Sequence, residues 1–88
     1  MDEIEYPIDG TLDLHTFHPR DIKDLIPEYI LECKARNINQ IRIIHGKGTG
    51  TLRRTVHAIL DRHPDVLDYW HEGPAGGSWG ATIVSLKI

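Results

Sequence analysis

Cysteine is almost absent from this chain, which has one cysteine, Cys33, among its 88 residues. A single thiol cannot form an internal disulfide and cannot by itself form a zinc site. Its position in the apolar pattern of a predicted helix indicates that it packs in the core. So little cysteine also suits a reducing compartment, and we expect a cytoplasmic location.

Long apolar runs are absent too. No stretch approaches the roughly 18 apolar residues that span a bilayer, and the first residues are acidic where a secretory signal would be basic. We therefore expect no membrane partner. The chain is 40 % hydrophobic and 26 % charged, which is typical of a globular domain, and its length has room for only one. We expect a flexible acidic segment at 1–9 and a single domain at 10–88.

Basic residues are outnumbered by acidic ones, 10 Lys and Arg against 13 Asp and Glu, and the formal net charge is -3. They are unevenly distributed, because residues 42–62 carry five of them and a single acidic residue, Asp61. The five are Arg42, Lys47, Arg53, Arg54 and Arg62. Such a segment could form a local basic surface for phosphate contacts, although an ordinary solvated helix face fits the pattern equally well.

The first predicted strand covers residues 11–15, where apolar and polar residues alternate with a period of two. Leu12 and Leu14 then lie on one face, and Asp13 and His15 on the other. Because Asp13 and His15 share a face, we expect the carboxylate to orient the imidazole or to hold its proton.

The remaining elements follow from periodicity and from the positions of glycine and proline. A helix is predicted from about Pro19 to Arg36, and Pro27 predicts a kink in it because an interior proline removes a backbone hydrogen bond. The other predicted elements are a buried strand at 40–45, a helix from near Gly50 to before Pro64, and strands at 66–71 and 81–88. The order β-α-β-α-β-β predicts an α/β fold with a mixed sheet, whose first two strands are parallel and last two antiparallel.

A glycine-rich loop, residues 45–50 (His-Gly-Lys-Gly-Thr-Gly), follows the second predicted strand. Alternate glycines let the backbone approach an anion and expose amides at a helix start. Lys47 adds a positive charge, and Thr49 could donate a hydrogen bond or cap the helix. Arg53 and Arg54 lie in the first turn, where basic residues are unfavourable unless an anion is near. The pattern is not a Walker P-loop and is a weak dinucleotide motif, and a structural glycine turn is the alternative.

Two histidines are predicted to meet at this loop. His15 ends the first strand and His45 the second, and the carboxyl ends of neighbouring parallel strands lie at one edge of the sheet. Their imidazoles should therefore flank one crevice, with His18 a further candidate there. The other histidines are interpreted as surface or helix-end residues: His57, His63 and His71.

Three blocks of the sequence resemble the signature motifs of the Smr (small MutS-related) domain family. They are Leu12–His15, His45–Gly50 followed by Leu52-Arg53, and Gly76–Thr82. Their order and spacing match over about residues 10–88. The resemblance implies a two-layer α/β sandwich with a mixed four-stranded sheet, and nicking or endonuclease activity on DNA or RNA in several members. Some members cut messenger RNA at stalled ribosomes, which leaves the ribosome open as a partner.

The residues and the resemblance together predict a functional set. The predicted catalytic residues are Asp13, His15, His45 and Lys47. The predicted nucleic-acid contacts are Gly46, Lys47, Gly48, Thr49, Gly50, Arg53, Arg54, Gly77 and Trp79, where the indole could stack on a base or cover the sheet edge. One position departs from the family pattern, because Thr16 stands where a glycine usually follows the histidine.

These residues predict a nuclease in which the loop amides and Lys47 bind the scissile phosphate while His15 and His45 act as acid and base. RNA is the favoured substrate because its 2′-hydroxyl is a built-in nucleophile. One site carboxylate, Asp13, argues against a two-metal centre, while a single divalent ion such as magnesium stays open. The alternatives are a non-catalytic module for nucleic acid or the ribosome, and a domain for a small phosphorylated ligand. We expect a monomer.

Overall fold

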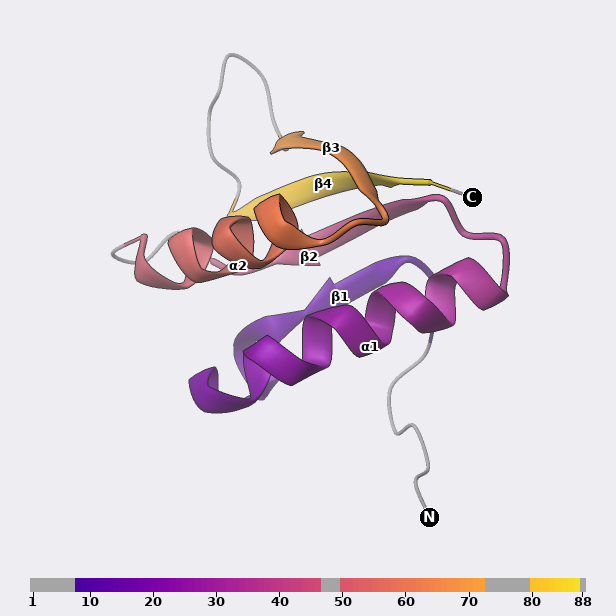
Figure 1. The fold of residues 1–88 in the computed structure, drawn as a ribbon. Coiled ribbons are helices and arrows are strands. Elements are labelled where there is room, and N and C mark those ends of the chain that lie inside the picture. The colour runs from indigo at the N-terminus through magenta and orange to yellow at the C-terminus, as the bar shows by residue number, and fades with distance from the viewer. Residues whose placement is uncertain (1–7, 47–49, 73–79, 88) are drawn as a thin grey trace.

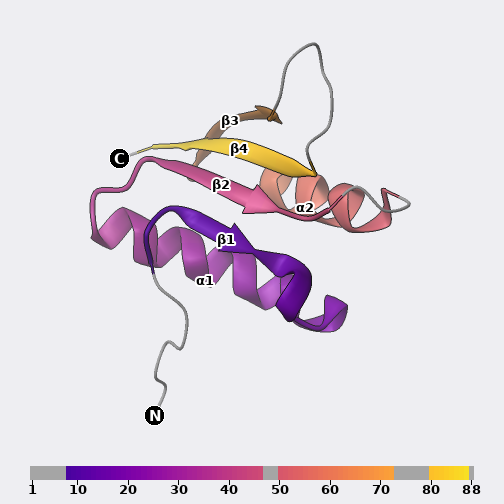
Figure 2. The same ribbon diagram turned by 180° about the vertical axis from the view of Figure 1, so that it is seen from behind.

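The computed structural model describes residues 8–46, 50–72 and 80–87. The helical elements are the 3-10 turns η1 (Leu14–Thr16) and η2 (Pro19–Asp21) and the helices α1 (Ile22–Ala35) and α2 (Thr51–Arg62). The strands are β1 (Thr11–Asp13), β2 (Gln40–Ile44), β3 (Val66–His71) and β4 (Ala81–Leu86). The predicted order β-α-β-α-β-β is confirmed. Both helices cover the same face of the sheet, which gives two layers (Figure 1), and the opposite face carries no helix (Figure 2).

The four strands form one mixed sheet in the order β1-β2-β4-β3. β1 pairs parallel with β2, with Asp13 opposite Ile44, so both strands end at the same edge. β4 is antiparallel to both of its neighbours, β2 and β3. The predicted mixed sheet is therefore confirmed, and the last strand of the chain lies between β2 and β3.

The core lies between the sheet and the two helices. Ile41 and Ile43 of β2 and Val84 of β4 are fully buried, because alternate residues of a strand point to the helix-covered face. The apolar stripe of α1 packs against them, and Cys33 in that stripe is fully buried, as predicted. Burial raises the pKa of the Cys33 thiol. Packing therefore accounts for this cysteine.

Helix α1 begins three residues later than predicted. Pro19 opens the turn η2, in which the ring of His18 accepts a hydrogen bond from the Arg20 amide at 3.3 Å, and the α-helix begins at Ile22. The helix continues through Pro27 to Ala35. Arg36 is its C-cap, and the next residue, Asn37, turns the chain away in a left-handed conformation (φ 61°) that asparagine tolerates well.

The first strand is shorter than predicted. β1 ends at Asp13, and residues 14–16 form the turn η1 instead of extending the strand to His15. The carboxylate of Asp13 caps this turn by accepting a hydrogen bond from the His15 amide at 3.1 Å. Leu12 and Leu14 are both buried, as the alternation predicts, because the turn also directs Leu14 to the core.

The ends of two other strands shift slightly. β2 ends at Ile44 and β4 at Leu86, each short of the predicted strand end. Helix α2, Thr51–Arg62, has the predicted bounds. Neither α-helix in the described part of the chain has the length and apolar character needed to cross a membrane.

Candidate functional site

The carboxyl ends of β1 and β2 lie at one end of the molecule, together with η1, η2 and the start of α2 (Figure 1). This is the edge at which the loop of residues 45–50 was predicted to bind an anion. Several predicted site residues lie outside the described residues: Lys47, Gly48, Thr49, Gly77 and Trp79. Their predicted contacts stay predictions.

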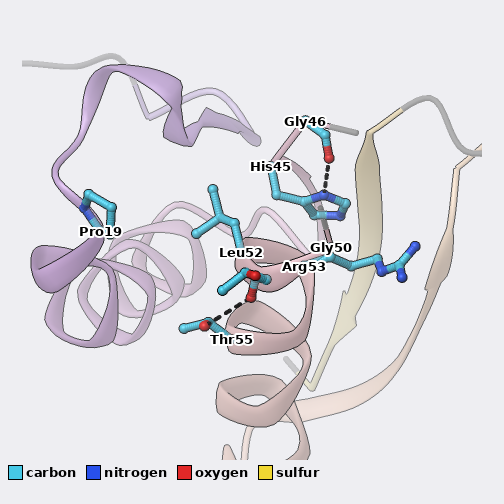
Figure 3. Close-up of a pocket in the computed structure, with 8 residues that line it drawn as sticks. Pro19, His45, Gly46, Gly50, Leu52, Arg53 and Thr55 are labelled. Carbon is cyan, nitrogen blue, oxygen red and sulfur yellow. Dashed lines mark hydrogen bonds between the residues drawn. The ribbon is translucent and has the colours of Figure 1, made fainter. Parts of the chain in front are cut away.

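A pocket of about 300 Å³ opens at the start of α2. The described residues that line it come from η2, the end of β2 and the first turns of α2: Pro19, His45, Gly46, Gly50, Thr51, Leu52, Arg53 and Thr55. Leu52 points towards Pro19 across the hollow, whereas Arg53 extends from the other side of the helix (Figure 3). Asp13 and His15 are not among these described lining residues. Of the two predicted histidines, His45 therefore lines the pocket at the start of α2 and His15 does not.

The start of α2 has the features of an anion site. Gly50 occupies the N-cap position with φ 88°, which favours glycine, and supplies no side-chain cap. The first-turn amides of a helix have no acceptor within it, and the first turn of α2 holds no acidic residue. The Arg53 guanidinium lies over Gly50, because a Cβ built on that glycine would be 3.2 Å from Arg53 Nη2. The helix dipole and Arg53 therefore place positive charge together.

The amide of Gly46 does not match the prediction that the loop exposes its amides. The backbone N–H groups of His45 and Gly46 both donate to the carbonyl of Gly80, each at 2.8 Å. Because these donors bond within the protein, the predicted exposure is wrong for Gly46. Gly46 is instead the point at which the backbone, anchored to Gly80, enters the loop.

Asp13 and His15 form the predicted pair, although through a turn and not along a strand. Asp13 Oδ1 lies 2.7 Å from His15 Nδ1 and also accepts from the His15 amide. These hydrogen bonds lower the pKa of the Asp13 carboxyl. The ionised carboxylate can only accept, so Nδ1 carries the hydrogen. The His15 side chain is 75 % exposed, which leaves Nε2 open to a ligand.

His45 is held differently, because both of its ring nitrogens have partners inside the protein. Nδ1 lies 3.0 Å from the carbonyl oxygen of Gly46, and Nε2 lies 2.9 Å from Oγ1 of Thr82. Burial lowers the pKa of His45, and the charge of Arg53 adds to the effect. The acid-base role predicted for His45 stays a prediction, and the hydrogen bonds support a role in holding the loop.

His57 was interpreted as a surface or helix-end residue, and the structure shows that this is wrong. Its Nε2 lies 2.9 Å from the same Thr82 oxygen that contacts His45. Its ring centroid is 4.7 Å from that of Tyr69 and 5.2 Å from that of His71. Burial lowers the pKa of His57, and His71 adds to the effect. One signal in the sequence could have placed His57 near the site. It lies four residues after Arg53, and this spacing puts both side chains on one face of the helix.

The basic segment of residues 42–62 does not form one surface. Arg42 lies opposite Ile83 in the sheet, and its Nε donates to both carboxylate oxygens of Glu72 at 2.8 Å. Within the described residues, the other ion-paired cations are Lys34 and Arg36, which belong to the carboxyl-terminal end of α1. No described ion pair involves the three arginines of α2: Arg53, Arg54 and Arg62. Among the described ion pairs, nothing neutralises the arginines of α2, which leaves them available to an external anion.

Metal ligands are not gathered in the part of the chain that the structure describes. No group of three or more His, Cys, Asp or Glu side chains among residues 8–46, 50–72 and 80–87 is arranged to hold a metal ion. At this edge a carboxylate contacts an imidazole in a single pair, Asp13 with His15, among the described residues.

A protein-family model, the Smr domain, matches residues 12–87. The chain is 33 % identical over 81 residues to Endonuclease MutS2 of Thermomicrobium roseum, a match that covers 92 % of this chain and 10 % of the relative. It is 36 % identical over 76 residues to Endonuclease MutS2 of Staphylococcus saprophyticus, covering 86 % of this chain and 10 % of the relative. The chain thus spans about a tenth of the length of these curated relatives.

Two solved structures have the same architecture. The Smr domain of Thermus thermophilus MutS2 superposes with a TM-score of 0.80 at 28 % identity, covering 91 % of this chain and 100 % of that one. YdaL, a stand-alone small MutS-related protein from Escherichia coli, also gives a TM-score of 0.80, at 27 % identity, covering 96 % of this chain and 69 % of that one. The predicted two-layer fold, with two helices and a mixed four-stranded sheet, is confirmed.

Proposed function

Because this chain belongs to the Smr domain family, we propose that it binds the phosphate backbone of nucleic acid at the start of α2 and cleaves it with Asp13 and His15. The observation that carries the proposal is the exposed His15 ring, held at Nδ1 by Asp13 with Nε2 open. It lies at the edge of the sheet where β2 leads into the cationic start of α2. The name of the MutS2 relatives, endonuclease, agrees with this chemistry.

Phosphate binding is supported by the charge distribution on α2. Arg53 has no described ion-pair partner, and the first-turn amides point out of the helix start. Lys47 of the adjoining loop adds a further cation in this proposal. An oxyanion that gains charge in the transition state is stabilised most by such fixed donors.

RNA is the proposed substrate, because its 2′-hydroxyl can attack the adjacent phosphorus without an activated water. Nε2 of His15 takes the proton of that hydroxyl, the new O–P bond forms, and the bond to the 5′-oxygen breaks. The leaving oxygen takes a proton from a second donor, for which Lys47 is the candidate in this proposal, because both ring nitrogens of His45 bond inside the protein. Asp13 holds His15 in the required tautomer through its hydrogen bond to Nδ1.

The test is an incubation of the purified chain with end-labelled RNA, single-stranded DNA and double-stranded DNA, each with magnesium or with a chelator. We expect cleavage of RNA, and a fall of about 100-fold or more in its rate for His15→Gln. The matched control is His63→Gln, a histidine at the far end of α2 whose ring accepts from the Asp65 amide at 3.1 Å. Equal cleavage by the His15→Gln and His63→Gln variants would overturn the role of His15.

A second function is favoured by one observation. Both ring nitrogens of His45 are occupied, so among the described residues of this pair only His15 is open to act as acid or base. A domain that binds RNA or a ribosome without cutting it would need only the cationic start of α2. Salt-dependent RNA binding with no cleavage on any of the three substrates would identify this binding module.

A further inference from the structure

The hydroxyl of Thr82 joins two histidines that are far apart in the sequence. Thr82 is fully buried in β4, and its Oγ1 lies 2.9 Å from Nε2 of His45 and 2.9 Å from Nε2 of His57. The two imidazole centroids are 6.2 Å apart. The hydroxyl is therefore the bridge between the end of β2 and the middle of α2.

Hydrogen-bond chemistry fixes the direction of each contact. The Gly46 carbonyl can only accept, so Nδ1 of His45 carries the hydrogen, and in the neutral ring Nε2 is an acceptor. The single Thr82 hydrogen then points to His45, and the Thr82 oxygen accepts from Nε2–H of His57. One arrangement of hydrogens thus satisfies the whole row, which runs from His57 through Thr82 and His45 to Gly46.

The row ends at the corner that begins the glycine-rich loop. The backbone amides of His45 and Gly46 donate to Gly80, while the His45 ring contacts Gly46 and Thr82. Gly46 has φ 83°, which lets the chain turn sharply there. The corner is therefore held by β4 through both its backbone and its side chain.

We infer that Thr82 and His57 are positioning residues, which fix the orientation of the His45 ring through its Nε2 atom and so hold the start of the phosphate-binding loop. This inference rests on the proposed function for its consequence in binding, but the tautomers are independent of it. Among the described residues, Thr82 provides the hydrogen that points to His45 Nε2, and His57 donates to the Thr82 oxygen.

The row tolerates one added proton but not two. If His45 takes a proton, Thr82 can reverse its hydroxyl and donate to a His57 ring that carries its hydrogen on Nδ1. With both rings charged, two N–H donors face one oxygen, and the hydroxyl hydrogen loses its acceptor. The charged and titratable groups around the pair are Arg53 of α2 and His71 of β3, which oppose a charge, and Asp61 of α2, which favours one on His57. Tyr69 of β3 donates to Asp61 at 2.6 Å.

The first measurement is the nitrogen-15 NMR spectrum of the histidine rings in the full chain at pH 7.5. We expect the hydrogen on Nδ1 in His45 and on Nε2 in His57. In Thr82→Val, which has the same shape without the hydroxyl, the Nε2 signal of His45 should shift because that nitrogen loses its hydrogen-bond donor, whereas Thr82→Ser should restore the wild-type spectrum. A wild-type His45 with its hydrogen on Nε2, or a spectrum unchanged in Thr82→Val, would overturn the inference.

The second measurement is binding of a 12-nucleotide single-stranded RNA. We expect the Kd to be about tenfold higher for Thr82→Val, and within about twofold of the wild-type value for Thr82→Ser. If Thr82→Val does not fold, the pair His57→Gln and His57→Leu replaces it, since glutamine keeps a donor for Thr82 and leucine does not. Equal affinity within a pair would overturn the positioning role. A wild-type chain that binds no RNA would instead contradict the proposed function. The NMR spectra of the histidine rings would still test the row of hydrogen bonds.

Discussion

The histidines that follow β1 and β2 lie at the same edge of the sheet but are held in opposite ways. His15 is mostly exposed, with one ring nitrogen bonded to Asp13 and the other open. His45 is partly buried, and both of its ring nitrogens bond inside the protein. A histidine that exchanges protons with a ligand needs an open nitrogen, and one that holds a loop needs two fixed partners. Under the proposed function, this difference gives the acid-base role to His15 on the β1 side and a supporting role to His45 on the β2 side.

The largest expected effect is on the β1 side. In Asp13→Asn an amide can donate to Nδ1 of His15 and favour the wrong tautomer, so we expect RNA cleavage to fall by about 100-fold with little change in binding. The measurement is kcat/KM on labelled RNA together with Kd. Asp9→Asn is the matched control, because Asp9 Oδ1 accepts from the Thr11 amide at 3.0 Å and contacts no described histidine. Similar loss in both variants would remove the contrast between the two carboxylates.

A smaller effect is expected from the cation on the β2 side. Arg53→Gln should weaken RNA binding and lower the slope of log K against log salt by about one, as expected for one lost phosphate contact. Arg36→Gln is the control, because Arg36 is already paired with Glu32 at the end of α1. Titrations at several salt concentrations measure both slopes. If Arg53→Gln keeps the wild-type slope, the start of α2 is not a phosphate site.

The smallest expected effect is on stability in acid. Burial lowers the pKa of His45 and His57 in the folded chain, so the unfolded chain takes up protons first as the pH falls below about 7. The free energy of unfolding should therefore fall between about pH 7 and the folded-state pKa values. The lowered pKa of Asp13 acts in a separate range, where stability is lost only as the pH falls below about 4.

Urea denaturation at pH 7.5, 6.5 and 5.5 measures the histidine contribution. His57→Gln should lose less stability over this range than the wild type, because it lacks one of the two groups. Partial exposure of His57 to solvent keeps the difference small. If the free energy of unfolding falls equally with pH in the two proteins, His57 does not contribute to the loss of stability in acid.

Local patterns predicted much of the fold and part of the site. Helix α2 has the predicted bounds, because Gly50 and Pro64 mark its limits and an apolar stripe runs between them. The pairing of Asp13 with His15 was also predictable, since the residues are two apart. The turn η1 was not, because Leu14 is buried whether residues 14–16 continue the strand or turn, so the same apolar pattern fits both conformations.

Contacts between distant residues account for what the sequence did not predict. Thr82 meets His57 across 25 positions and His45 across 37, through a sheet order that local periodicity does not specify. Periodicity places a side chain on one face of its own element but does not identify the opposite partner. His57 was therefore misinterpreted, although its helix and its face of that helix were predictable.

The central position of β4 also constrains the order of folding. The sheet order β1-β2-β4-β3 means that the edge of β2 stays unpaired until residues 81–86 are available. During synthesis, β1, α1 and β2 can come together early, since they are contiguous in sequence, while β3 must wait for β4, the strand with which it pairs. Because β4 also carries Thr82 and follows Gly80, the support beneath the loop is completed only when this last strand inserts. Ligand binding at this edge should thus require that β4 has already been inserted beside β2.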